Sequence, residues 1–341
     1  MTAPVYSLSI DTDSDMPMHW LSGLSYCESL DALDMVSVEL APDTSADIKA
    51  VLKKVRAGAA YELSLGTRKL PGDLVRVSTM ARSPGTYQIA ALGLEQLHRL
   101  RHQRLSEVAV VSKDKVASAI IQKAGLTPKA QGVGATAAEA IFLDDPMLAT
   151  LKRLADERNF ALRSNGKTLE FTPRNAPAAG AALSLSWQVD TFGLSIHQDL
   201  SEVVTAVTVF GRDHRKGVEI VKYEAKEADL KKISGGDTAV GIRGKLSAAP
   251  IFVNETIRCA TASEVKERAV AILAAAAETF TTGTLRCALR LDARAGQKVS
   301  ITDAPWPLGG PFLIHSVTHT LAPAAAQGTE IQVFSDGIAK P

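Results

Sequence analysis

The sequence of 341 residues is poor in aromatic residues, cysteine and net charge, and each shortage excludes a class of protein. Aromatic residues make up 5% of the chain, so we expect an aliphatic core. Lys and Arg (38) balance Asp and Glu (37), which leaves no global field to attract nucleic acid or an anionic membrane. The three cysteines, Cys27, Cys259 and Cys287, fit neither a zinc site nor a secreted disulfide framework, which favours a reducing compartment.

A signal peptide and long hydrophobic runs are also missing. The first residues, MTAPVYSLSIDTDSD, lack the basic and apolar regions of a signal peptide. The longest apolar run, AVAILAAAA at 269–277, is shorter than the roughly 20 residues that cross a bilayer. We therefore expect a protein that is made in the cytosol and does not insert stably into a membrane.

Known catalytic and binding motifs match poorly. DTDSD at 11–15 begins like a calcium loop, but Met16 and Ser22 stand where the loop needs Gly and Glu. GVGATA at 132–137 resembles a dinucleotide fingerprint, yet a polar, turn-like segment precedes it instead of a buried strand. We predict no catalytic residue, no cofactor and no metal ion, although a triad or carboxylate pair assembled across the fold stays open.

Two histidine pairs and a basic run have structural explanations. His315 and His319 stand four apart on an expected strand, hence about 13 Å apart, too far for one metal ion. His98 and His102 have no carboxylate or cysteine nearby to complete a site. They lie in the basic run at 97–104, which lacks the interspersed aromatics of single-strand binders, so we expect no specific nucleic-acid binding.

The first third, residues 1–105, reads as strands around one helix. Thr44 with Asp47 resembles a capping box, Gly58 supplies a left-handed helix stop, and LPGD and SPGT are predicted turns. The predicted elements are strands at 5–10, 34–40, 61–66, 73–80 and 86–93, with a helix at 44–58.

The last third, residues 176–341, repeats this order. Thr261 with Glu264 forms a clear capping box. The predicted elements are strands at 203–211 and 218–225, a helix at 261–280, and strands at 284–291, 298–302, 312–321 and 329–335. Two strands, a capped helix and at least three more strands thus occur in both thirds, with negligible identity, which suggests two similar barrel-like domains.

The middle segment, residues 106–175, is a small α/β module. Gly125 ends its first helix. Asp145 is the expected N-cap of the second helix, with Pro146 as its first helical residue. A hairpin follows around Asn165-Gly166.

This module resembles the central segment of the phage late control gene D family, the baseplate or tail hub proteins of phages and related contractile injection machines. The family pattern is a helix ending in Ala-Gly-Leu, a helix with Leu-x-x-Leu-Ala, and a hairpin ending in Leu-x-Phe; a Gly-x-Asp turn and a histidine follow later. The positions that carry the resemblance are Ala124, Gly125, Leu126, Asp145, Pro146, Leu151, Leu154, Ala155, Leu169, Phe171, Gly211, Asp213 and His319.

The resemblance implies an α+β, mainly β fold with two tail-tube-like β-barrel domains and the small α/β module between them. It implies a homotrimeric hub that joins a hexameric tail tube to a trimeric spike and also contacts other baseplate or tail-tip proteins. Such a hub would be made in the host cytoplasm, assembled into a virion tail or injection particle, and catalyse nothing. Two alternatives stay open: a cell-wall-degrading tail enzyme, and a single-barrel tube or adaptor subunit, which the doubled pattern disfavours.

Overall fold

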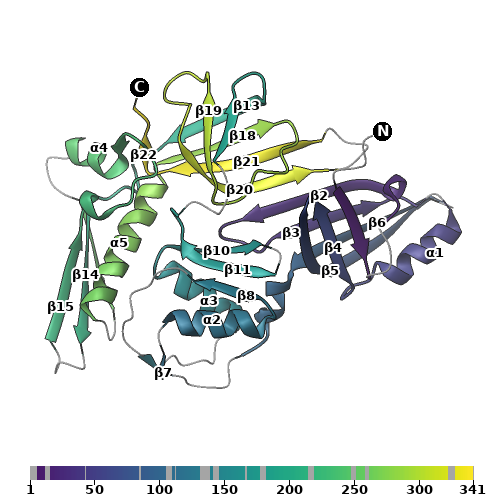
Figure 1. Cartoon of the computed structure of the whole chain (residues 1–341), viewed down its shortest axis with the longest axis horizontal. Coiled ribbons are helices and arrows are strands. Elements are labelled where there is room, and N and C mark those ends of the chain that lie inside the picture. Colours follow the sequence, from purple (N-terminus) through teal and green to yellow (C-terminus); the bar gives the residue numbers. More distant parts are fainter. Residues whose placement is uncertain are drawn as a thin grey trace.

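The computed structural model shows a mixed α+β chain in which strands dominate (Figure 1). Twelve strands form one continuous curled sheet, which divides into two sets of six. We call these sets the first and the second half-barrel. The structure describes residues 6–11, 16–42, 44–83, 86–104, 110–111, 113–130, 139–140, 146–165, 167–176, 182–213, 219–246, 251–257, 261–321 and 327–340.

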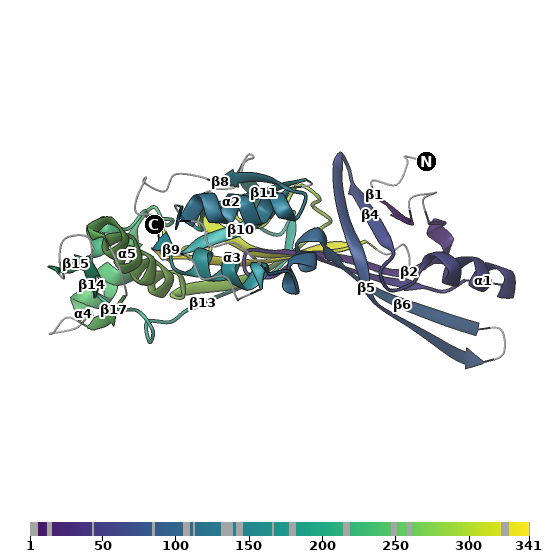
Figure 2. The same cartoon turned by 90° about the horizontal axis from the view of Figure 1, so that it is seen from below.

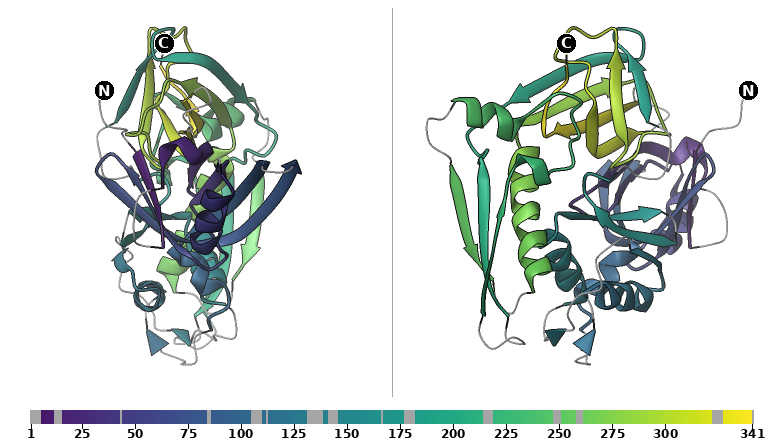
Figure 3. Two further views of the ribbon diagram at one scale, coloured as in Figure 1. Left: turned by 90° about the vertical axis from the view of Figure 1, so that its right-hand side faces the viewer. Right: turned by 60° about the vertical axis from the view of Figure 1, so that its left-hand side comes forward.

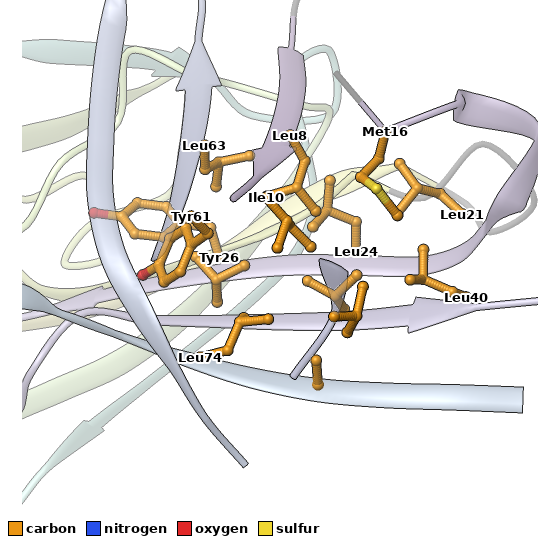
Figure 4. Packing of buried hydrophobic residues seen from close by; sticks show 14 of the residues in the cluster. Leu8, Ile10, Met16, Leu21, Leu24, Tyr26, Leu40, Tyr61, Leu63 and Leu74 are labelled. Atoms are coloured by element: carbon orange, nitrogen blue, oxygen red, sulfur yellow. The ribbon is translucent and has the colours of Figure 1, made fainter. Parts of the chain in front are cut away.

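The first half-barrel has the strand order β1-β4-β5-β6-β3-β2. Its strands are β1 (Tyr6–Ile10), β2 (Leu21–Ser29), β3 (Met35–Leu40), β4 (Ala60–Leu65), β5 (Arg68–Ser83) and β6 (Thr86–Glu95). Alternate residues of these strands point into the curl, as Leu8, Leu63 and Leu74 do in Figure 4. The curled sheet therefore encloses a largely aliphatic core of its own.

Helix α1 (Ser45–Lys54) begins where the sequence predicts but ends earlier. Thr44 is the N-cap, and its Oγ1 accepts the N–H of Asp47 at 3.1 Å. Val55 leaves the helical conformation with a ψ of 87°. Gly58 has the expected positive φ of 87°, but its N–H donates to the backbone of β5, so it shapes the link into β4 and does not end the helix.

The predicted turn at 70–73 is wrong, because these residues lie inside β5. The chain turns earlier, at Gly66, whose φ is +58°. A Cβ on Gly72 would stand 2.3 Å from the carbonyl oxygen of Leu94 and 2.5 Å from the ring of Tyr61. The Pro-Gly pair thus permits close packing within the sheet instead of a reversal.

The second half-barrel has the order β12-β19-β20-β21-β18-β13. Its strands are β12 (Leu183–Ser186), β13 (Thr191–Gln198), β18 (Thr281–Cys287), β19 (Lys298–Thr302), β20 (Phe312–Thr320) and β21 (Gly328–Ser335). The strand predicted at 284–291 is wrong at its end, since β18 stops at Cys287. Beyond it the chain turns, and Leu289 and Leu291 pack against the core of the first half-barrel.

The strands predicted at 203–211 and 218–225 do not belong to the second half-barrel. They form a separate sheet of order β15-β14-β17, covered by helix α5, as the right view of Figure 3 shows. Its elements are β14 (Ala206–Asp213), β15 (Glu219–Ala225), β17 (Phe252–Thr256) and α5 (Ala262–Glu278). Alternation specifies a strand but not its partner, and β12 and β13 take the places in the half-barrel. The predicted capping box of Thr261 and Glu264 is present at the start of α5.

The central module packs two helices on a sheet of order β10-β11-β8. Its elements are α2 (Lys113–Lys123), β8 (Thr127–Ala130), α3 (Met147–Asp156), β10 (Phe160–Asn165) and β11 (Thr168–Pro173). Gly125 has a φ of +75° just beyond α2, which confirms its predicted role as the helix stop.

Pro146 is the N-cap of α3 and not its first helical residue, so that prediction is wrong. Its ψ of 140° is extended, and it forms a β-bridge with Arg104. The N–H of Met147 donates to the carbonyl of Gln103 at 2.8 Å. This pairing with the preceding segment holds Pro146 outside the helix. Asp145 lies outside the described residues.

The remaining elements are short. They are β7 (Val110–Val111), β9 (Glu139–Ala140), β16 (Asp237–Thr238), α4 (Ala239–Leu246), β22 (Gly337–Ile338) and the 3-10 helices η1 (Met18–Trp20), η2 (Gln96–Arg101) and η4 (Glu227–Asp229). Further predicted features lie wholly or partly outside the described residues: the calcium-like DTDSD, the turn at 83–86, GVGATA at 132–137, Gly166 of the hairpin turn, and Cys259.

Candidate assembly interface

The two half-barrels are joined by direct strand pairing, which we call the seam. Strand β2 is the last strand of the first half-barrel, and it runs antiparallel to the C-terminal part of β20. The register extends from Ser25 opposite Thr320 to Ser29 opposite Ser316. In Figure 1 the two strands lie side by side at the centre of the molecule. The seam makes the two half-barrels one continuous sheet.

A buried ionic cluster lies at the seam. Glu28, which is 3% exposed, accepts hydrogen bonds from Arg68 at 2.8 Å and from Arg294 at 3.3 Å. Tyr26, on the same strand, donates its hydroxyl to Asp34 at 2.7 Å. Burial, with the neighbouring carboxylates, raises the pKa of Asp34 well above its usual range. The cluster ties residues of both half-barrels together through charge.

His319 belongs to this seam. It is fully buried on β20, and its ring stacks on Tyr26 with 6.2 Å between ring centroids. Its Nδ1 lies 3.1 Å from Oγ1 of Thr329. Burial lowers the pKa of His319 to about 4, so the ring is neutral at neutral pH and packs as part of the core.

A second polar junction connects the central module to both half-barrels and to α5. Arg174 donates to Asp31 at 2.7 Å, lies 3.3 Å from Glu278, and stands over the ring of Phe334 at 5.5 Å. Asn159 also donates to Glu278, at 2.9 Å. Burial raises the pKa of Glu278 to about 7. Asn159, Arg174 and Glu278 line a cavity of about 530 Å³, but their polar groups bind one another, as in a structural junction.

Each half-barrel has a strand edge away from the seam that no described strand covers. Among the described strands, β13 pairs only with β18. Likewise β5 pairs only with β6 from Arg76 to Ser83, where the β5–β6 hairpin projects from the body in Figure 2. Phe192 on β13 is 72% exposed and Met80 on β5 is 58% exposed. Unpaired backbone groups beside exposed apolar side chains are a template for another strand.

The outer sheet has exposed apolar residues on both of its edge strands. Ile220 on β15 is 65% exposed and Phe252 on β17 is 49% exposed. The described part of the molecule therefore has several surfaces suited to assembly. Within the part of the chain that the structure covers, no three His, Cys, Asp or Glu residues cluster as a metal site would require.

The predicted family positions fall in separate places. Leu126, Leu151, Leu154, Ala155, Leu169 and Phe171 share the buried core of the central module, beside Ala124 and Gly125 at the end of α2 and Pro146 at the start of α3. Gly211 and Asp213 lie on β14 in the outer sheet, and His319 lies in the seam. These positions shape three parts of the fold and do not converge on one site.

The seam residues Glu28, Arg68 and Arg294 were missed by sequence reasoning. Glu28 and Arg294 are 266 residues apart, and nothing local marks either as buried. The same holds for Arg174 and Glu278 of the second junction.

The architecture is that of phage tail proteins. The chain resembles the tail protein from Neisseria meningitidis MC58 with a TM-score of 0.72 and 13% identity, over 98% of this chain and 97% of that one. It resembles the prophage MuSo2 43 kDa tail protein from Shewanella oneidensis with a TM-score of 0.69 and 14% identity, over 96% and 97% of the chains.

A secretion-system protein has the same architecture. The E. coli c3393 protein, a component of the type VI secretion system described as structurally similar to T4 bacteriophage tail proteins gp27 and gp5, matches with a TM-score of 0.59 and 12% identity, over 98% of this chain and 79% of that one. No family model and no curated protein matches the sequence. The predicted fold class, α+β and mainly β with the fold of tail proteins, is thus confirmed. None of the described helices is long and apolar enough to cross a membrane.

Proposed function

We propose that the protein is a structural subunit of a phage tail or contractile injection baseplate, and specifically its trimeric hub. Three chains would present six half-barrels, which matches a sixfold tail tube on one side and a threefold spike on the other. Residues 1–105 and 176–341 would supply the two tube-like units, and residues 106–175 would lie outside them. The partners would be further copies of the chain, the tube protein, the spike protein and other tail-tip proteins.

The observation that carries this proposal is the duplicated half-barrel. One chain contains two curled six-stranded units joined edge to edge, so each chain supplies two neighbouring positions of a ring. A tube subunit with one such unit would supply a single position. The likeness to tail proteins and to a type VI secretion component supports the same role.

Solution mass tests the proposal. Light scattering at several concentrations, with and without candidate tube and spike proteins, is expected to show particles of three chains, each of 36.1 kDa. A chain that stays monomeric in the presence of both partners would refute the hub, and so would a stable hexamer.

A further inference from the structure

The two half-barrels repeat each other strand for strand. Taken in chain order, β1 to β6 of the first correspond to β12, β13, β18, β19, β20 and β21 of the second, and the order across the sheet is the same. Four of the five neighbouring pairs are antiparallel in both. The fifth differs, since β1 runs antiparallel to β4 whereas β12 runs parallel to β19.

The correspondence between β2 and β13 holds residue by residue. The pairing of β2 with β3 shifts between Leu21 and Gly23, and the pairing of β13 with β18 shifts between Thr191 and Gly193. Each bulge is followed by the same Gly-Leu-Ser sequence. A bulge is a specific device of a strand, so its recurrence aligns the two strands without ambiguity.

The correspondence between β5 and β20 is equally strict. The pairing of β5 with β6 shifts between Leu74 and Arg76, and that of β20 with β21 shifts between Ile314 and Ser316. The edge of β20 beyond its bulge is the one that β2 covers in the seam. The same edge of β5, from Arg76 onward, is covered by no described strand.

We propose that β13 of one copy pairs antiparallel with β5 of a second copy and so repeats the seam between chains. This inference rests on the proposed function and assigns the surfaces that build the ring. Within the chain, β2 pairs with β20. Their counterparts β13 and β5 lie on different half-barrels, and each has an edge that no described strand covers, on β5 from Arg76 onward. Three copies joined in this way form a ring of six half-barrels with six alike seams.

The repeat fixes the register between copies. In the seam, Ser25, Cys27 and Ser29 stand opposite Thr320, Thr318 and Ser316. The corresponding pairs between copies are Ser195 with Met80, His197 with Ser78, and Asp199 with Arg76. The last pair brings together two exposed side chains of opposite charge, which favours this register.

Backbone direction agrees with this register. Asp199 donates its N–H to the carbonyl of Phe280, the residue before β18, so alternate residues such as Ile196 direct their backbone groups to the open side of β13. The N–H of Leu74 donates to the carbonyl of Ala59, just before β4, so the backbone groups of Leu74 face the β4 side of β5. The bulge after Leu74 shifts the alternation of backbone direction by one residue, so Thr79 directs its N–H to this same side, which is open beyond the bulge. Ile196 and Thr79 therefore form a hydrogen-bonded pair. Ser78 and His197 form a non-hydrogen-bonded pair, in which the two Cα atoms lie closer together.

Disulfide trapping tests the pairing. The Cα atoms of a non-hydrogen-bonded antiparallel pair are about 4.5 Å apart, which a disulfide spans. Ser78→Cys with His197→Cys, both at exposed positions, is expected to shift the chain on a non-reducing gel from 36.1 kDa to twice and three times that mass. The matched control, Thr79→Cys with His197→Cys, places the thiols on opposite faces and is expected to give no more product than the single variants. Absence of product, or equal product in the control, would overturn the pairing.

Blocking the edge gives an independent readout. Thr79→Pro removes the N–H that faces the open side and leaves the ladder to β6 intact, so assembly into particles of three chains is expected to be lost. Thr79→Ala keeps that N–H and is expected to assemble as the unchanged chain does. If Thr79→Pro does not fold, the disulfide pair carries the test alone.

The outcomes separate the two proposals. If the Ser78→Cys, His197→Cys variant forms particles of three chains but no disulfide between chains, the strand pairing is overturned and the hub stands. A disulfide ladder that continues beyond three copies would support the pairing and overturn the closed ring of the hub.

Discussion

Removal of the Glu28 charge is expected to weaken the whole sheet. Glu28→Gln preserves the shape of the side chain but leaves Arg68 and Arg294 without their shared counter-charge, and their side chains are only 17% and 16% exposed. Breaking a buried ion pair by removing one partner costs about 3–5 kcal/mol. Since a folded domain is stable by only about 5–15 kcal/mol, the loss is large.

Urea unfolding followed by circular dichroism measures this effect. The matched control is Glu330→Gln, because Glu330 also pairs with an arginine of a neighbouring strand, Arg286, at 2.9 Å. The side chains of Glu330 and Arg286 are 40% and 65% exposed, so loss of this pair is expected to lower the free energy of unfolding by less than about 1 kcal/mol. If the Glu28 variant unfolds at the same urea concentration as the Glu330 variant, the seam is not held by buried charge.

Three further variants test other parts of the fold. Gly72→Ala would force a Cβ against the Tyr61 ring and is expected to cost about 1–3 kcal/mol in urea unfolding, whereas Gly235→Ala, with nothing within 4 Å, is expected to be neutral. Thr261→Ala removes the α5 cap and is expected to cost about 1 kcal/mol in the same assay; no loss would show that the cap is dispensable. Because the pKa of Glu278 is raised to about 7 in the folded chain, its stabilising contribution is present below the unfolded value of about 4.5 and is lost as the pH rises toward 7. Thermal unfolding of Glu278→Gln is therefore expected to lose this pH dependence, and an unchanged slope would contradict the assignment.

The elements that the sequence predicts well are those that local chemistry determines. The capped starts of α1 and α5, the glycine stop after α2 and the alternating strand β1 all need only neighbouring residues. The apolar stripe and the hairpin strands of the central module were predictable for the same reason, whereas the start of α3 was not, because Pro146 pairs with a segment outside the helix.

Strand β13 was missed although its sequence alternates, with Leu194 and Ile196 directed to the core of the second half-barrel and Ser195 and His197 exposed. Strands β14 and β15 alternate clearly but pair elsewhere, and periodicity contains no information about the partner. The repeat of the half-barrels is reflected in the sequence by Gly-Leu-Ser at 23–25 and at 193–195. Three identical residues indicate a repeat only once the structure shows a bulge before each of them. The seam cluster is out of reach of sequence reasoning, since its charges meet only in the folded chain.

The seam also determines when the protein can finish folding. The ion pair between Glu28 and Arg294 cannot form until Arg294, 266 residues later in the chain, has been synthesised. At roughly 5–20 residues per second, the ribosome leaves β2 uncovered for about ten to fifty seconds after it emerges. During that interval Glu28 has Arg68 as a partner but lacks Arg294, and the edge of β2 that β20 later covers is free to pair with another strand. The pairing of β2 with β20, which joins residues nearly 300 positions apart, thus closes the monomer, and until it forms the open edge of β2 is exposed to premature association.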